Sequence, residues 1–175
     1  CRVPDLSGEH IQAHVTAALA EDIGEGDATT NALVGAQRRC QGHIVARESL
    51  TFCGRDLIET VFQRLDAEAV ITHLHSDGDE VPAGATLATL DASARALLTG
   101  ERTALNYAQR LSGVATQAAR YVAAVKGSGV LLLDTRKTTP GWRDLEKYAV
   151  QCGGARNHRH GLDDMVMIKD NHLGA

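Results

Sequence analysis

The residue types best suited to chemistry lie in the C-terminal part of the chain, where two short apolar segments are each followed by basic residues. The apolar segment 131–134 is followed by Arg136 and Lys137, and the segment 165–168 is followed by Lys169. Ligands of α/β barrels and doubly wound sheets bind where strands end at their carboxyl side. Cations at such positions therefore indicate a pocket for a small anion that carries several negative charges.

A third basic group, Asn157 to His160, lies between these two and contains His158 and Arg159. An arginine can hold a carboxylate through two hydrogen bonds, whereas a lysine acts as a compact charge for a phosphate or a pyrophosphate. The segment 138–141 adds two hydroxyl groups and a Pro-Gly turn, which favours an anion pocket over a solvated loop. Lys169 follows a run that we expect to be a strand buried on both faces, and this favours a functional lysine over a strand-edge solubiliser.

A metal site is the competing interpretation of the histidine-rich segment. Its candidate ligands would be His158, His160 and one of Asp163, Asp164 or His172. The arginines between them argue against it, because a cation beside a dication costs energy. His73 and His75 form a second pair, which a polar sheet face explains. No Ser-His-Asp or Cys-His arrangement is evident, so we expect no protein nucleophile.

The elements that position these residues follow from apolar periodicity. It predicts helices over 10–20, 56–65, 93–109, 116–125 and 142–152, with a break at Ser112–Gly113. The predicted strands span 41–46, 50–53, 69–75, 85–90, 130–134, 155–157 and 165–169. The fold class is α/β. Residues 1–104 form an N-terminal α/β sandwich (lid) domain with a mostly antiparallel sheet, and 105–175 the first part of an open, incomplete α/β barrel.

Composition excludes several classes of function. The 175 residues are 43% hydrophobic and 23% charged, which is typical of a globular protein. A net charge of -4, a pI of about 6.0 and 3% aromatic residues argue against nucleic-acid binding. No apolar run approaches the roughly 18 residues of a membrane span. The four cysteines form no CxxC pair and no signal peptide is visible, so reduced thiols in the cytoplasm are expected.

Four long segments resemble one enzyme family. They are EDIGEGDATT (21–30), GERTALNYAQRLSGVAT (100–116), LLDTRKTTPGWRDLEKYAVQCGG (132–154) and NHRHGLDDMVMIKDNH (157–172). Together they resemble quinolinate phosphoribosyltransferase, also called nicotinate-nucleotide pyrophosphorylase (carboxylating). The resemblance implies that phosphoribosyl pyrophosphate and quinolinate are converted to nicotinate mononucleotide, pyrophosphate and carbon dioxide, with Mg²⁺, in de novo NAD biosynthesis. It also implies a homodimer in which one subunit's N-terminal domain covers the partner's barrel mouth.

The same resemblance implies roles for individual residues. Arg136, His158 and Arg159 would bind the two carboxylates, and Lys137 and Lys169 would be the catalytic lysines that serve quinolinate and the phosphate-bearing substrate. Arg102 would reach the partner subunit's site. The acidic residues that bind magnesium are expected beyond residue 175, and an α/β barrel usually needs roughly 200 residues or more. We therefore expect the chain by itself to be inactive and to expose apolar surface.

Two alternatives remain open at this point. A paralogue with the same fold could use another acceptor, as molybdenum-transport-associated relatives or a nicotinate-specific transferase would. The two carboxylate-binding groups favour a dicarboxylate. A non-catalytic binding module is suggested by 77–84, which resembles the turn of biotinyl or lipoyl carriers. However, no lysine precedes Lys126 to be modified.

Overall fold

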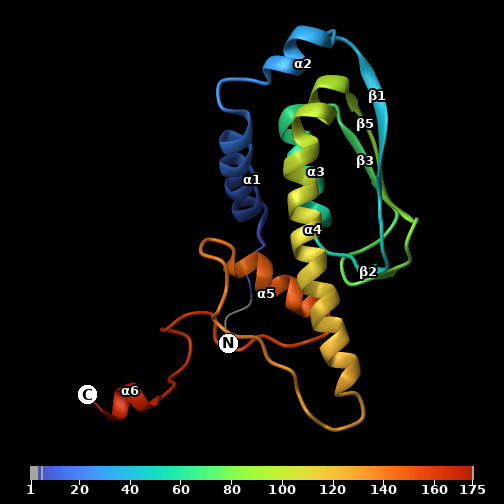
Figure 1. Cartoon of the computed structure of the whole chain (residues 1–175). Helices are drawn as coiled ribbons and strands as arrows, with labels where there is room; N and C mark the ends of the chain where they lie inside the picture. Colours follow the sequence, from blue (N-terminus) through green and yellow to red (C-terminus); the bar gives the residue numbers. More distant parts are fainter. Residues whose placement is uncertain (1–3, 5, 175) are drawn as a thin grey trace.

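The structure is a computed structural model that describes residue 4 and residues 6–174 (Figure 1). Its elements run in the order α1 (Gly8–Ile23), α2 (Ala28–Leu33), β1 (Arg39–Val45), β2 (Leu50–Thr51), α3 (Arg55–Leu65), β3 (Val70–His73), β4 (Glu80–Val81), β5 (Thr86–Ser93), α4 (Ala94–Ala124), α5 (Arg143–Cys152) and α6 (Asp170–Leu173). The mixed α/β class is confirmed. Among the described residues, no helix combines the length and the apolar character needed to cross a membrane.

An antiparallel sheet forms one layer of the N-terminal part. Its strand order is β1-β5-β3, and β2 and β4 make a separate two-stranded antiparallel pair. Helices α3 and α4 lie against one face of the sheet, with α1 beside them (Figure 1). The helical stripes predicted from the sequence face this core: Ile11, Val15, Leu19, Leu57, Ile58, Val61 and Phe62 are all buried.

The predicted break at Ser112–Gly113 is wrong, because α4 is continuous through both residues. The Ser112 hydroxyl accepts a hydrogen bond from the Cys53 backbone N–H at 3.0 Å and donates one to the Cys53 carbonyl at 3.2 Å. Burial against a neighbouring segment thus outweighs the cost of a helical glycine, about 1 kcal/mol. Since α4 also crosses the predicted domain boundary at 104/105, the two-domain division stays a prediction.

The strands predicted for the barrel are largely absent. Leu133 and Arg156 form a single parallel bridge, while 165–169 has no strand partner in the part of the chain that the structure describes. The run 165–168 was expected to be buried, but Val166 is 88% exposed and Ile168 69%. The physical reason is that a parallel strand is stable only between neighbouring strands and under covering helices, and none of the described elements supplies them here.

Candidate functional site

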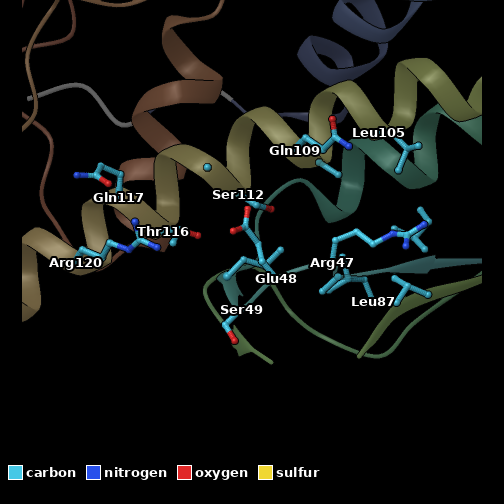
Figure 2. A pocket seen from close by; sticks show the side chains of 16 residues that line it. Arg47, Glu48, Ser49, Leu87, Leu105, Gln109, Ser112, Thr116, Gln117 and Arg120 are labelled. Atoms are coloured by element: carbon cyan, nitrogen blue, oxygen red, sulfur yellow. The ribbon is translucent and has the colours of Figure 1, made fainter. Parts of the chain in front are cut away.

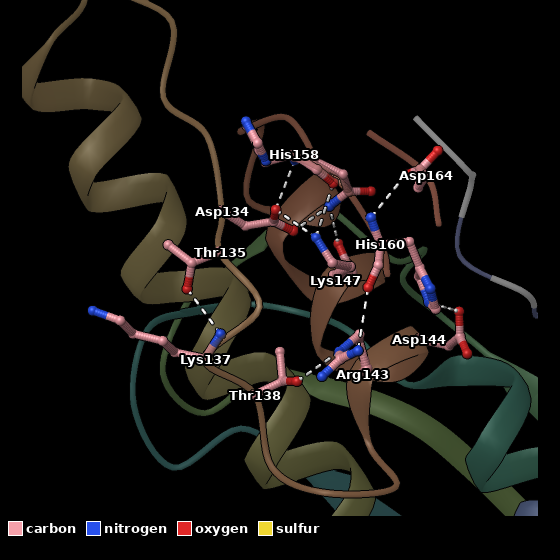
Figure 3. A network of polar contacts seen from close by, with 11 residues as sticks. Asp134, Thr135, Lys137, Thr138, Arg143, Asp144, Lys147, His158, His160 and Asp164 are labelled. Atoms are coloured by element: carbon pink, nitrogen blue, oxygen red, sulfur yellow. Dashed lines mark hydrogen bonds and ion pairs between the residues drawn. The ribbon is translucent and has the colours of Figure 1, made fainter. Parts of the chain in front are cut away.

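The buried carboxylate of Asp134 joins two of the predicted basic segments (Figure 3). One oxygen accepts hydrogen bonds from Lys147 Nζ at 2.6 Å and from the His158 backbone N–H at 2.7 Å. The other oxygen accepts one from Asn157 Nδ2 at 2.7 Å. The parallel bridge brings the two segments together, because the Asp134 N–H donates to the Arg156 carbonyl at 3.0 Å. Asp134 therefore fixes 134–137 beside 156–158.

Lys147 contributes the opposite charge from the middle of α5. Its side chain is only 1% exposed, and that of Asp134 6%. The ammonium also donates to the His158 carbonyl at 3.1 Å, and the Lys147 carbonyl accepts from Asn157 Nδ2 at 2.9 Å. A buried ion pair with further hydrogen bonds satisfies the condition under which burial of two charges is tolerated.

A second ion pair, between the buried carboxylate of Glu146 and the exposed side chain of Arg110, holds the turn that follows Lys137. Glu146 accepts hydrogen bonds from Arg110 Nη2 at 2.7 Å and from the Thr139 hydroxyl and backbone N–H at 2.7 and 3.2 Å. Burial alone would raise the pKa of Glu146, but the hydrogen bonds from Arg110 and Thr139 outweigh it and the pKa lies below its ordinary value. The carboxylate is thus charged and ties α5 to the turn and to α4.

The third contact set fixes the end of the histidine-rich segment. Arg143 donates to the Thr138 hydroxyl at 3.1 Å and to the His160 carbonyl at 3.2 Å. The His160 ring lies 2.8 Å from an Asp144 oxygen, and its backbone N–H donates to Asp164 at 2.8 Å (Figure 3). Both ends of 156–160 are therefore anchored on α5.

The structure places four of the six predicted site residues on these two joined segments. Arg136 is half-buried, and its Nε is one of the buried polar atoms without a hydrogen-bond partner. Lys137 is exposed, while its backbone N–H donates to the Thr135 hydroxyl at 3.0 Å. His158 is half-buried, and Arg159 is 6% exposed with Nη1 donating to the Met165 carbonyl at 3.1 Å.

The other two predicted residues lie elsewhere. Lys169 is exposed and precedes α6, which Figure 1 shows extended away from the helices and the sheet. Arg102 is exposed on the N-terminal half of α4, eight positions before Arg110, which contacts Glu146 of α5. No described contact joins either residue to the other four, so the grouping of all six stays a prediction.

Sequence reasoning missed the residues that organise the site. Asp134 was noted only as the end of a strand, and Lys147 was read as part of an amphipathic helix. A lysine in a helix of alternating charges is usually solvated, so no local signal marked it. Asn157 belongs to the basic segment that was recognised, and its Oδ1 is a second buried atom without a partner. An unpaired donor on Arg136 and an unpaired acceptor on Asn157 are the polar groups that a ligand could use.

Two cavities flank α4 without containing the predicted cations. Figure 2 shows one of about 460 Å³ between α4 and the segment after β1, where Arg47, Glu48 and Arg120 contribute charges. Another of about 640 Å³ is mostly apolar and includes Leu133 and Asp134. It borders the Asp134 network through Asp134 itself.

The acidic residues near the predicted site do not fit a magnesium ion. Both oxygens of Asp134 accept hydrogen bonds from Lys147, Asn157 and His158, and Asp144 lies against His160. The structure instead groups Cys53, Asp77 and Cys152, the one set of three possible ligands within 4.8 Å of one another among the described residues. We therefore assign neither Asp134 nor Asp144 as a magnesium ligand, and the magnesium site stays a prediction.

The basic segments 136–137 and 156–160 are joined where a single parallel bridge ends, and the N-terminal part is an antiparallel sheet covered by helices, an arrangement that defines a mixed α/β protein. Two family models match nearly the whole chain. The model of the quinolinate phosphoribosyl transferase N-terminal domain matches residues 27–112, and that of the C-terminal domain matches residues 114–175. The chain belongs to the quinolinate phosphoribosyltransferase family.

Individual relatives agree with the family models. The chain is 48% identical over 157 residues to a probable nicotinate-nucleotide pyrophosphorylase [carboxylating] of Synechocystis. The aligned region covers 90% of this chain and 53% of the relative. It is 49% identical over 156 residues to the Bacillus subtilis protein of the same name, covering 89% and 53%. The chain thus spans about half the length of these curated relatives.

The fold is also that of solved members. The structure of the nicotinate-nucleotide pyrophosphorylase from Francisella tularensis superposes with a TM-score of 0.93 at 40% identity, over 99% of this chain and 62% of that one. NadC from Streptococcus pyogenes gives 0.93 at 40% identity over 97% and 60%. The fold class expected from the sequence is confirmed.

Proposed function

We propose that a protein containing this chain transfers the phosphoribosyl group of phosphoribosyl pyrophosphate to quinolinate, with decarboxylation to nicotinate mononucleotide, pyrophosphate and carbon dioxide, in de novo NAD biosynthesis. The observation that carries the proposal is the pair of joined basic segments, with the buried Nε of Arg136 left without a partner. A ligand with two carboxylates supplies an acceptor for the Arg136 Nε and negative charge for the other cations of these segments. The family of the chain supports the same substrate.

In this proposal Arg136, His158 and Arg159 bind the two carboxylates of quinolinate. Their fixed positions orient the ring nitrogen toward the ribose, so that the reaction is accelerated by positioning and by electrostatic stabilisation of charge as pyrophosphate leaves. Lys137 and Lys169 supply positive charge toward the phosphate-bearing substrate. Once the ring nitrogen is alkylated, its positive charge stabilises the carbanion that forms when the adjacent carboxylate departs as carbon dioxide.

The remaining parts of the site lie outside the residues brought together here. We propose that Arg102 enters the site of the partner subunit in a homodimer, which its exposure on α4 permits. We propose that Mg²⁺ accompanies phosphoribosyl pyrophosphate, held by residues other than Asp134 and Asp144. A cytoplasmic location is supported by the free thiols of Cys40, Cys53 and Cys152, as expected in a reducing compartment.

Calorimetric titration with quinolinate tests the proposal, with nicotinate as the comparison ligand. We expect quinolinate to bind more tightly than nicotinate, because nicotinate offers one carboxylate to the basic segments. Arg136→Ala should weaken quinolinate binding by roughly 10- to 100-fold, the value of one charged hydrogen-bonding group. His73→Ala is the control, since the His73 ring contacts Glu59 of α3 at 3.2 Å and belongs to neither basic segment.

Equal affinity for the two ligands would contradict the assignment of quinolinate, and so would an equal loss in the Arg136 and His73 variants. Circular dichroism of each variant separates loss of the pocket from loss of the fold. The chain alone should show no turnover when both substrates and Mg²⁺ are supplied. Turnover at an ordinary enzymatic rate would contradict the expectation that further residues are needed.

A further inference from the structure

Two cysteines meet at a place unrelated to the cation site. Cys53 lies between β2 and α3, and Cys152 is the last residue of α5, 99 positions later by sequence number. Their sulfur atoms and a carboxylate oxygen of Asp77 all lie within 4.8 Å of one another. Cys53 is fully buried and Cys152 half-buried. A buried and a half-buried thiol are thus brought together from distant parts of the chain.

The Cys53 side of this pair is rigidly held. Its backbone N–H and carbonyl both bond to the Ser112 hydroxyl on α4, at 3.0 and 3.2 Å. The next two backbone N–H groups, of Gly54 and Arg55, donate to Asp77 at 3.0 and 3.1 Å. Asp77 thereby accepts hydrogen bonds at the N-terminus of α3, where a carboxylate is favourable.

The same Asp77 holds the Cys152 side. Its other oxygen accepts a hydrogen bond from the Tyr148 hydroxyl at 3.0 Å, one helical turn before Cys152 on α5. Gly153, which follows Cys152, packs so closely on α4 that an added Cβ would lie 2.6 Å from the Cβ of Ala118. The thiols are therefore positioned by elements fixed independently of the sulfur atoms themselves.

The environments of the two thiols differ in the direction that disulfide exchange requires. A hydrogen bond with Cys152, together with burial, raises the pKa of the Cys53 thiol far above its ordinary value. The same hydrogen bond lowers the pKa of the Cys152 thiol despite its burial. The half-buried Cys152 is thus the better thiolate, and the thiolate is the form that attacks a disulfide.

We propose that Cys53 and Cys152 are a redox-active dithiol that forms an internal disulfide on reaction with a small disulfide such as oxidised glutathione. The Cys152 thiolate attacks one glutathione sulfur, the glutathione S–S bond breaks, and one glutathione thiolate leaves. Cys53 then attacks the Cys152 sulfur, and the second glutathione leaves. The Cys53 proton passes to a departing thiolate. Two cysteine thiols are oxidised, and one glutathione disulfide is reduced to two glutathione molecules.

A metal ion is the other chemistry that two cysteines and a carboxylate could provide. A structural zinc site has four ligands, whereas this cluster offers three. Both oxygens of Asp77 already accept hydrogen bonds, from Gly54, Arg55 and Tyr148. Binding of a metal would have to displace these donors, while a disulfide leaves them in place. The bond requires the sulfur atoms to approach from within 4.8 Å to about 2 Å, so at least one of the two side chains must move.

The disulfide would link the start of α3 to the end of α5, the helix that carries the Asp134 and Glu146 contacts. The proposal is independent of the proposed function, since neither thiol belongs to the cation site. Its test is a mass measurement. The chain in a Cys1→Ser background is incubated with excess oxidised glutathione, quenched with an alkylating reagent and digested. We expect a peptide linked through Cys53 and Cys152, a loss of the mass of two hydrogen atoms, and full reversal by dithiothreitol.

Single variants distinguish an attacking thiol from a resolving one. In Cys53→Ser, Cys152 should remain as a stable mixed disulfide with glutathione, because no thiol is left to displace it. In Cys152→Ser, the buried Cys53 should stay unmodified. Cys40→Ser is the matched control and should behave as the parent chain, since Cys40 on β1 is half-buried and is not in the cluster.

Three results would overturn the proposal. They are full alkylation of both thiols in the treated chain, equal modification of the two single variants, and tight binding of one Zn²⁺ that requires both cysteines. The mass measurement on the chain that retains both Cys53 and Cys152 needs no substitution in the core. It therefore remains a valid test even if Cys53→Ser unfolds the chain. Circular dichroism of each variant identifies that case.

Discussion

Substitution of Asp134 by alanine should be one of the most destabilising single changes in this chain. It removes the acceptor of three hydrogen bonds and leaves the Lys147 ammonium, 1% exposed, without a counter-charge. Loss of one partner of a buried ion pair costs about 3–5 kcal/mol. Unfolding free energies of domains are about 5–15 kcal/mol, so the change consumes a large part of the total stability.

The contributions can be separated with a second substitution. Lys147→Met keeps an unbranched chain of similar size and removes the charge, so the double variant no longer buries an unpaired ammonium. It still lacks the acceptor for Asn157 and for the His158 backbone, each an unsatisfied group worth about 1–3 kcal/mol. We therefore expect the double variant to be more stable than Asp134→Ala alone, with a coupling energy of about 2 kcal/mol.

Urea unfolding measures both effects. The single tryptophan, Trp142, directly precedes α5 and stacks on Tyr107 at 5.2 Å between ring centroids, so its fluorescence reports on this region. The m-value should stay constant while the midpoint falls. Lys137→Met is the matched control, because Lys137 is exposed and its side chain points away from Asp134 in Figure 3. It should change stability by less than about 0.5 kcal/mol. A loss below about 1 kcal/mol for Asp134→Ala, or strictly additive single changes, would refute the reasoning.

Three further changes test other parts of the structure. Gly153→Val should destabilise the chain by about 1–3 kcal/mol, because the added side chain overpacks against α4. Gly113→Ala should stabilise the chain by about 0.5–1 kcal/mol, because an added Cβ meets no atom within 4 Å at this helical position. Thermal unfolding measures both changes. The pKa of Glu146 in the folded chain lies below its value in the unfolded chain. The Glu146 carboxylate therefore stabilises the folded chain above about pH 4.5, and this stabilisation is lost as pH falls through the folded pKa. Acid unfolding of Glu146→Gln should accordingly be less steep than that of the parent chain, and an unchanged slope would contradict it. Ile168→Ser should alter urea stability by less than about 0.5 kcal/mol, since Ile168 is 69% exposed; a loss above 1 kcal/mol would show that this segment packs.

The N-terminal part was predictable because its elements bury one face locally. The apolar stripes of α1 and α3 face one core, and the alternating strands pair as an antiparallel sheet. The continuity of α4 was not predictable in this way. Ser112 and Gly113 are weak helix formers, and the bond from Ser112 to Cys53 joins residues 59 positions apart. A contact of that range leaves no trace in a local pattern.

The contrast between local sequence patterns and contacts of distant residues also applies to the candidate site. The basic segments were found because cations after short apolar runs are conspicuous in a sequence. Their joining through Asp134 and Lys147 depends on a bridge between Leu133 and Arg156 and on the packing of α5. The run 165–169 shows the opposite error, since its apolar residues suggested burial that no described element provides.

Consecutive residues of α5 explain how the cation loop is held at both ends. Lys147 pairs with Asp134, at the start of the loop, and Glu146 binds Thr139, at its end. Neighbouring side chains on a helix point in different directions. One turn of α5 can therefore bind the loop both at Asp134 and at Thr139. Asp134 is paired with Lys147 and does not neutralise Arg136. The Nε of Arg136, which lies between Asp134 and Thr139 in the sequence, has no hydrogen-bond partner. The buried ion pair therefore fixes the shape of the loop and also leaves its positive charge available to an anionic ligand.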